Sequence, residues 1–73
     1  MKKMAIISRL DLVMAERKMS LNELSEKVGV STVNLSKLKN GHVSAVRFST
    51  LSALCRVLNC QPGDLLEYEE DSP

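Results

Sequence analysis

Aromatic residues are almost absent from this 73-residue chain, which has one Phe, one Tyr and no Trp. Because 44% of the residues are nonetheless hydrophobic, the core must consist of aliphatic side chains, which suit packed helices. A chain of this length buries one small core and has no room for a second domain. The composition therefore favours one small helical domain.

Residue types that build catalytic or metal sites are scarce. The two cysteines, Cys55 and Cys60, are too few for a disulfide scaffold, and Cys55 falls on an apolar helical stripe, where a thiol behaves as a small hydrophobic group. His42 is the only histidine, so the chain has no metal-ligand spacing and no nucleophile beside a histidine. It also lacks paired acids in a plausible cleft and a glycine-rich phosphate loop. We therefore expect no metal, no cofactor and no enzymatic activity.

Long hydrophobic runs are missing as well. No segment approaches the ~18 unbroken apolar residues of a membrane span, and Met1-Lys2-Lys3 precedes too short an apolar run for a signal peptide. The chain has no internal repeat, linker or low-complexity segment. These observations predict a cytoplasmic protein. Because thiols stay reduced in the cytoplasm, we expect Cys55 and Cys60 to be free thiols with a structural role.

The net charge of +1 does not by itself indicate a polyanionic partner, but the charges are unevenly distributed. Five of the nine acids lie in the last ten residues, which leaves ten bases against four acids, or +6, in residues 1–63. A basic body with an acidic tail is typical of nucleic-acid binding, although an ordinary solvated surface gives the same count.

Residues 20–41 contain two helix starts and two helix stops, so they predict two short helices joined by a tight turn. Ser20 and Glu23 have the spacing of a capping box, in which the hydroxyl accepts from the N–H of Glu23 and the carboxylate accepts from the N–H of Ser20. Gly29 ends the first helix, because glycine tolerates the left-handed conformation found at helix ends.

Ser31 caps the second helix, Gly41 ends it, and only Val30 separates the two helices. Such a short turn forces the helices to cross steeply. Apolar residues hold one face of each helix: Leu21, Leu24 and Val28 in the first, and Leu35 and Leu38 in the second.

This order of residues resembles the helix-turn-helix of the phage-repressor and Cro-type transcriptional regulators, also called the xenobiotic-response-element family. The matching positions are Leu24, Ser25, Val28, Gly29, Val30, Leu35, Leu38 and Gly41. A small residue at position 25 lets the second helix approach the first. The resemblance implies an all-α, compact five-helix domain like that of lambda repressor. The implied function is that of a sequence-specific DNA-binding transcriptional regulator, with a repressor as the expected kind.

Three further helices are expected outside the motif. The first runs from Ile6 to about Lys18, with Leu12 pointing away from its apolar face and exposed as leucines often are. That apolar face contains Ile6, Ile7, Leu10, Val13 and Met14.

The fourth helix is expected from about Phe48 to Leu58, and Asn59 ends it. Its inner face contains Phe48, Leu51, Leu54, Cys55 and Leu58. The fifth is the short segment 61–66, in which Pro62 is acceptable in the first turn and Leu65 and Leu66 close the core. The domain therefore spans residues 1–66, and residues 67–73 form an acidic, mobile tail.

The helix from about Thr32 to Asn40 is expected to enter the major groove. Leu35 and Leu38 face inward on this helix, so its other side faces outward. The family resemblance assigns base-edge contacts to Thr32, Val33, Ser36 and Lys37.

Each of these side chains suits a contact with DNA bases. Lys37 can donate to guanine, Thr32 can bond to several bases, and Val33 can cover a thymine methyl, the alternative for Val33 being tolerated exposure. Asn34 is expected to lean toward the core and to support the Ser31 cap.

Phosphate contacts are expected from four residues near helix ends: Ser20, Asn40, Lys39 and Arg47. His42, in the loop before Arg47, either reaches a phosphate or is exposed to solvent. Leu21 stands where the family often has a phosphate-binding glutamine, so we expect that contact to be lost.

One such domain covers few base pairs, and useful specificity needs two half-sites about 34 Å apart. We therefore expect a homodimer on double-stranded DNA, with an interface that includes Ala53, Val57, Leu66 and Tyr68. Tyr68 packs either on its own domain or on the second subunit. The alternative function is an antitoxin-like or adaptor module, in which the same fold binds a protein partner.

Overall fold

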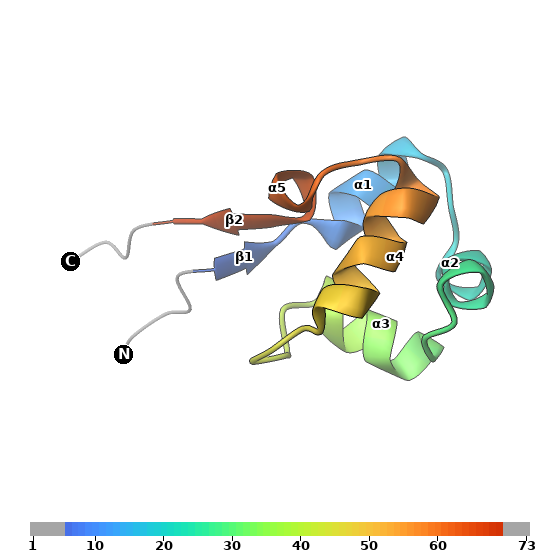
Figure 1. Ribbon diagram of the computed structural model, residues 1–73, viewed down its shortest axis with the longest axis horizontal. Coiled ribbons are helices and arrows are strands. Elements are labelled where there is room, and N and C mark those ends of the chain that lie inside the picture. Colours follow the sequence, from blue (N-terminus) through green and yellow to red (C-terminus); the bar gives the residue numbers. More distant parts are fainter. Residues whose placement is uncertain (1–5, 70–73) are drawn as a thin grey trace.

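Five helices and two short strands make up residues 6–69, the part of the chain that the computed structural model describes (Figure 1). The helices are α1 (Leu10–Glu16), α2 (Leu21–Val28), α3 (Thr32–Lys39), α4 (Phe48–Leu58) and α5 (Pro62–Leu65). The strands β1 (Ile6–Ser8) and β2 (Leu66–Tyr68) pair antiparallel in a two-stranded sheet, which we call the terminal ribbon. The predicted five-helix fold is confirmed, and the terminal ribbon is an element that the sequence analysis did not predict.

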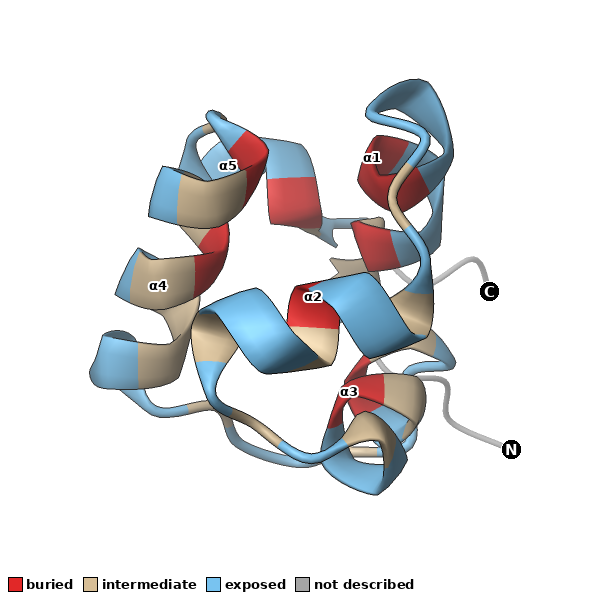
Figure 2. Ribbon diagram, turned by 90° about the vertical axis from the view of Figure 1, so that its right-hand side faces the viewer, coloured by how far each residue is buried: buried red, intermediate tan, exposed pale blue. Residues whose placement is uncertain are grey.

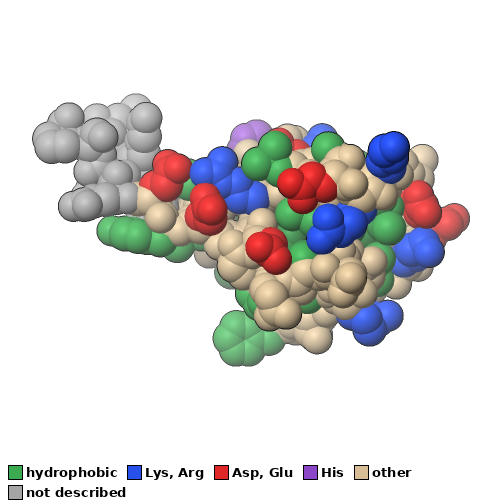
Figure 3. Space-filling model, turned by 90° about the horizontal axis from the view of Figure 1, so that it is seen from above, with side chains coloured by type: hydrophobic (Ala, Val, Ile, Leu, Met, Phe, Trp, Pro, Cys, Tyr) green, Lys and Arg blue, Asp and Glu red, His purple; other side chains and the backbone are tan. Residues whose placement is uncertain are grey.

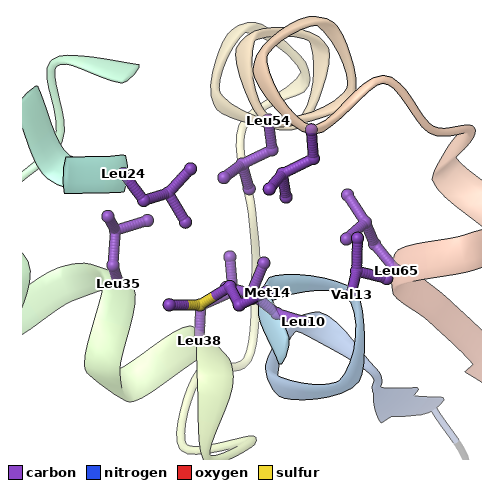
Figure 4. Packing of buried hydrophobic residues seen from close by; sticks show 9 residues of the cluster. Leu10, Val13, Met14, Leu24, Leu35, Leu38, Leu54 and Leu65 are labelled. Atoms are coloured by element: carbon purple, nitrogen blue, oxygen red, sulfur yellow. The ribbon is translucent and has the colours of Figure 1, made fainter. Parts of the chain in front are cut away.

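The core is aliphatic, as the composition predicted. All five helices contribute to it, and their inner sides are the buried ones (Figures 2 and 4). The buried side chains are Leu10, Val13, Met14, Leu24, Leu35, Leu38, Leu54, Leu58 and Leu65. Full burial of a leucine stabilises a fold by about 1.5–3 kcal/mol, so this cluster holds the helices in place.

The first helix is shorter than predicted: its expected start at Ile6 is wrong, and it ends at Glu16, close to the expected end at about Lys18. Residues 6–8 form β1, because the backbone there pairs with the other end of the chain: the N–H of Arg9 donates to the carbonyl of Leu65 at 2.6 Å. Lys18 has φ 54°, in the left-handed region, which ends the helical path. Leu12 is 53% exposed, as expected.

Helix α4 has the predicted bounds, and Asn59 ends it with φ 55°. Arg17 binds this end, since its Nε donates to the carbonyl of Leu58 at 2.7 Å and its Nη2 to that of Asn59 at 3.2 Å. The prediction that Phe48 faces inward is wrong, because this first residue of α4 lies at the end of the helix and is 87% exposed.

The terminal ribbon changes the expectation for the acidic end. Leu65 is buried, whereas Leu66 is half-buried and belongs to β2. Arg9 binds Glu67 at 2.8 Å and Glu69 at 3.2 Å. The predicted tail is therefore held to the domain by strand pairing and ion pairs as far as Glu69, its mobility stays a prediction, and residues 70–73 lie outside the described part.

Candidate nucleic-acid interface

Helices α2 and α3 form the predicted pair, and serine hydroxyls cap both of them. Ser20 Oγ accepts from the N–H of Glu23 at 3.1 Å, and Ser31 Oγ accepts from the N–H of Asn34 at 3.2 Å. The reciprocal bond from Ser20 N–H to the Glu23 carboxylate does not form between these described residues, so only half of the predicted capping box is present. Gly29 ends α2 with φ 82°, as predicted.

The turn between the two helices is fixed by a side chain as well as by the glycine. Ser25 Oγ donates to the carbonyl of Val30 at 2.6 Å, so the small residue at the helix crossing also binds the turn. Leu24 and Leu35, one from each helix, are both 0% exposed. The orientation of α3 is therefore set by buried contacts and not by its outer surface.

The outer side of α3 carries the four residues that the family resemblance assigned to base contacts. Val33 is 62% exposed, Lys37 is also exposed, and Thr32 and Ser36 are half-buried. Val33, Ser36 and Lys37 lie on the side of α3 away from its buried leucines, and Thr32 lies on the shoulder between the two sides. The structure thus brings these four side chains together, and their contact with bases stays a prediction.

The stretch of chain that contains α3 carries basic side chains and no acidic ones. No Asp or Glu occurs between Ser31 and Gly63, a segment that contains Lys37, Lys39 and Arg47. Among residues 6–69, the ion pairs involve Arg9 and Arg17, so these three cations keep their charge unpaired. Figure 3 looks onto the opposite face of the molecule, where acidic side chains lie among basic ones.

The predicted phosphate-binding residues lie at the ends of three helices. Ser20 is exposed at the start of α2, Lys39 and Asn40 lie at the end of α3, and Arg47 is exposed at the start of α4. Asn40 Nδ2 also donates to Ser36 Oγ at 3.5 Å, which links this end of α3 to its outer face. His42 is exposed.

A surface hollow beside α3 contains two polar residues that the sequence analysis did not assign to the site. Asn34 and Thr50 line it together with Ser31 and Arg47. The prediction that Asn34 leans toward the core is wrong, because only its backbone N–H binds the Ser31 cap while its side chain is exposed. Thr50 lies in the first turn of α4, where free N–H groups favour anions. Its position in the sequence could therefore have indicated a phosphate contact.

The four residues predicted for the dimer interface lie on two different elements. Ala53 and Val57 are half-buried on α4, and Val57 packs against the core. Leu66 and Tyr68 belong to β2, which projects from the helical body away from α4 (Figure 1). The structure does not bring these four residues into one patch, and the interface stays a prediction.

The two thiols lie at the end of α4. Both are free and half-buried, and the N–H of Cys60 donates to the carbonyl of Cys55 at 3.0 Å. Burial raises the pKa of the Cys60 thiol, and the neighbouring Cys55 raises it further. A raised pKa makes a thiol less reactive, which fits the predicted structural role. Within residues 6–69, no three His, Cys, Asp or Glu side chains are grouped to hold a metal ion, and no helix is long and apolar enough to cross a membrane.

Comparisons with known proteins also identify a helix-turn-helix domain. Residues 9–71 match the model of the Cro/C1-type HTH DNA-binding domain. The chain is 59% identical over 68 residues to YozG, an uncharacterized HTH-type transcriptional regulator of Bacillus subtilis, and the match covers 93% of this chain and 81% of YozG.

Solved structures of regulators have the same fold. The transcriptional regulator VanUg is 32% identical with a TM-score of 0.72, over 97% of this chain and 93% of VanUg. SinR, the master regulator for biofilm formation, solved in complex with DNA, is 28% identical with a TM-score of 0.69, over 74% of this chain and 86% of SinR. The chain therefore belongs to the Cro/C1-type helix-turn-helix DNA-binding family of transcriptional regulators.

Proposed function

We propose that this regulator is a repressor that binds duplex DNA as a homodimer, with α3 of each copy in a major groove. The observation that carries the proposal is the outer side of α3, where Val33 and Lys37 are exposed on a helix held by buried contacts. A helix fits the major groove, where base edges distinguish all four base pairs. Repression needs only occupancy, because a protein bound across a promoter excludes other proteins from it.

Sequence would be read by four side chains along one side of α3. Lys37 donates to a guanine, Thr32 and Ser36 bond to base edges, and Val33 covers a thymine methyl. An exposed valine among polar neighbours has a use if a methyl group lies opposite it.

The register of α3 in the groove would be set by phosphate contacts on both sides of it. Ser20 at the start of α2, and Lys39 and Asn40 at the end of α3, would contact DNA phosphates. Arg47 adds a cation at the start of α4, whose first N–H groups have no side-chain cap and are free to bind a phosphate. The free charges of Lys39 and Arg47 support this role.

The alternative, an antitoxin-like or adaptor module, would use the acidic end of the chain to bind a protein. Glu67 and Glu69 are already bound to Arg9, which leaves these two carboxylates less available to a partner. We therefore favour DNA binding as the principal function, carried out in the cytoplasm and without catalysis.

Fluorescence anisotropy tests this proposal, with duplex DNA from upstream of the protein's own gene and a scrambled duplex, each at two salt concentrations. Lys37→Ala should weaken binding to the upstream site by about 1–3 kcal/mol and relax its specificity. Lys18→Ala, which removes an exposed cation next to α1, is the matched control and should change little. Equal loss on both duplexes would show that Lys37 contacts only phosphate. Wild-type binding that is equal on both duplexes and erased by salt would count against a specific autoregulator.

A further inference from the structure

The terminal ribbon is short, and one of its faces is apolar. Its register places Ile6 opposite Tyr68 and Ser8 opposite Leu66, so these four side chains share one face, while Ile7 and Glu67 share the other. Ile6 is 50% exposed and Tyr68 69%. An isolated pair of strands is marginally stable in water, so a ribbon with an exposed apolar face gains stability from a further strand.

A groove borders this face. Three of its residues, Ile6, Ser8 and Leu66, line the groove together with loop residues Val43 and Val46, and the groove has a volume of about 160 Å³. Figure 3 shows hydrophobic side chains exposed along the ribbon, and in Figure 1 the ribbon projects from the helical body. Among residues 6–69, the ribbon therefore presents both an apolar face and two strand edges without a further strand, at one end of the molecule.

The hydrogen bonding identifies which backbone groups are open on β1. Arg9 lies opposite Leu65 in the continued register, and its N–H donates to the Leu65 carbonyl at 2.6 Å, so this is a hydrogen-bonded pair. Such pairs alternate along antiparallel strands, so Ile7 also bonds to β2. The N–H and C=O groups of Ile6 and Ser8 consequently point away from β2, toward the free edge.

The two edges of the ribbon differ in charge. A two-fold axis at Glu67, the middle residue of β2, would pair β2 with its copy through the outward backbone groups and place Glu67 directly opposite Glu67 of the copy. Like charges opposite each other destabilise a strand pair. The same operation on β1 places Ile7 opposite Ile7 and lets Ile6 exchange hydrogen bonds with Ser8, with no charge at the contact.

We propose that β1 is the dimerisation edge, on which a second copy of this chain pairs antiparallel about a two-fold axis at Ile7. The occupant is a second copy because the uncharged edge is self-complementary, with the outward groups of Ile6 matching those of Ser8. The result is one continuous sheet across both subunits, whose apolar face borders both grooves. This inference rests on the homodimer of the proposed function and replaces Ala53 and Val57 in its interface, while Leu66 and Tyr68 stay on the apolar face beside the contact.

Ile7→Lys tests the interface by sedimentation velocity of the free protein over a range of concentrations. Within one chain the new lysine lies opposite Glu67, and this attraction favours the fold. Across the two-fold axis it lies opposite the same lysine of the second copy, and this repulsion disfavours the dimer. We expect the dissociation constant of the dimer to rise at least tenfold, with an unchanged far-UV circular dichroism spectrum of the monomer. Ala53→Lys on α4 is the matched control and should leave dimerisation unchanged. An unaffected Ile7→Lys dimer, or a monomeric Ala53→Lys protein, would overturn the inference.

Ile7→Cys provides a second test that does not depend on how the lysine variant folds. Residues opposite each other in a non-hydrogen-bonded pair lie close enough for a disulfide. Oxidised glutathione should therefore link two copies through position 7, as peptide mass mapping can show, and Ser8→Cys should not link through position 8. No link at position 7 would contradict the axis.

Failure of this inference can be told apart from failure of the proposed function. A wild-type protein that stays monomeric at every concentration would overturn both the β1 interface and the homodimer, while the anisotropy measurement would still report DNA binding. A dimer that survives Ile7→Lys but loses sequence discrimination on Lys37→Ala would overturn only the interface.

Discussion

The helix-turn-helix and the terminal ribbon are held together over very different distances along the chain. Three hydrogen bonds that define α2, the turn and α3 join residues three or five positions apart. The side-chain bonds of the ribbon join Arg9 to residues 58 and 60 positions away. Because closing a long loop costs entropy before any contact is made, the ribbon depends on the folded body, whereas the caps and turn of α2 and α3 are set locally.

The largest effect should come from the core that both regions share. Leu35→Ala removes a fully buried side chain between α2 and α3 and should lower the free energy of unfolding by about 2–5 kcal/mol. DNA binding should fall with it. Urea denaturation measures the loss, and Leu12→Ala, at a half-exposed leucine, should cost far less. Similar losses in the two variants would contradict the assignment of the core.

A side chain at Gly29, in the turn of the helix-turn-helix, would strain the backbone without a steric clash. A Cβ at Gly29 would meet nothing within 4 Å, so the cost of Gly29→Ala, about 1–2 kcal/mol, comes from its φ of 82°. Gly63→Ala is the matched comparison, since Gly63 is also uncrowded but lies in α5 without a positive φ. That variant should be neutral or slightly stabilising. The melting temperature should therefore fall for Gly29→Ala and stay the same or rise slightly for Gly63→Ala.

Removal of one local hydrogen bond should have a smaller effect. Ser31→Ala deletes the cap of α3 and should destabilise the protein by about 0.5–2 kcal/mol. Ser52→Ala, at an exposed site inside α4, should be neutral or slightly stabilising, because alanine favours helix interiors. Loss of stability in both variants alike would mean that the Ser31 cap has no special role.

The smallest effect on stability should come from the ribbon. Arg9→Gln removes the ion pairs to Glu67 and Glu69, which lie at the surface and are weakened by salt. We expect a small decrease in melting temperature at low salt that disappears at high salt, with no change in DNA specificity. Hydrogen exchange should show faster exchange in residues 66–68 and unchanged protection in α2 and α3. A faster exchange in α3 would show that the two regions are coupled.

The same contrast explains what the sequence could predict. The caps at Ser20 and Ser31, the stop at Gly29 and the bounds of α4 all depend on neighbouring residues, and each prediction was confirmed. The outward face of α3 followed from the positions of Leu35 and Leu38 in the same helix. Local pattern and family resemblance were sufficient there.

Predictions that depended on distant contacts failed. Ile6 and Ile7 have helical spacing to Leu10, and nothing nearby shows that residues 65–68 will pair with this segment. The same pairing, not local composition, places Glu67 and Tyr68 in β2. The position of Phe48 at the start of α4 was predicted, but its 87% exposure depends on which segments pack against that end of the helix, and the residues of α4 alone do not specify this.

None of the residues that would recognise DNA belongs to the buried core. Ser25, Leu24 and Leu35 fix the position of α3 from the inside, while Val33 and Lys37 project into solvent. Mutations at Val33 and Lys37 can therefore change which operator the protein prefers while the fold stays stable, so no compensating mutation is needed. After a gene duplication, a few mutations could thus give regulators of different promoters. An engineer could retarget the protein by randomising Thr32, Val33, Ser36 and Lys37 on α3.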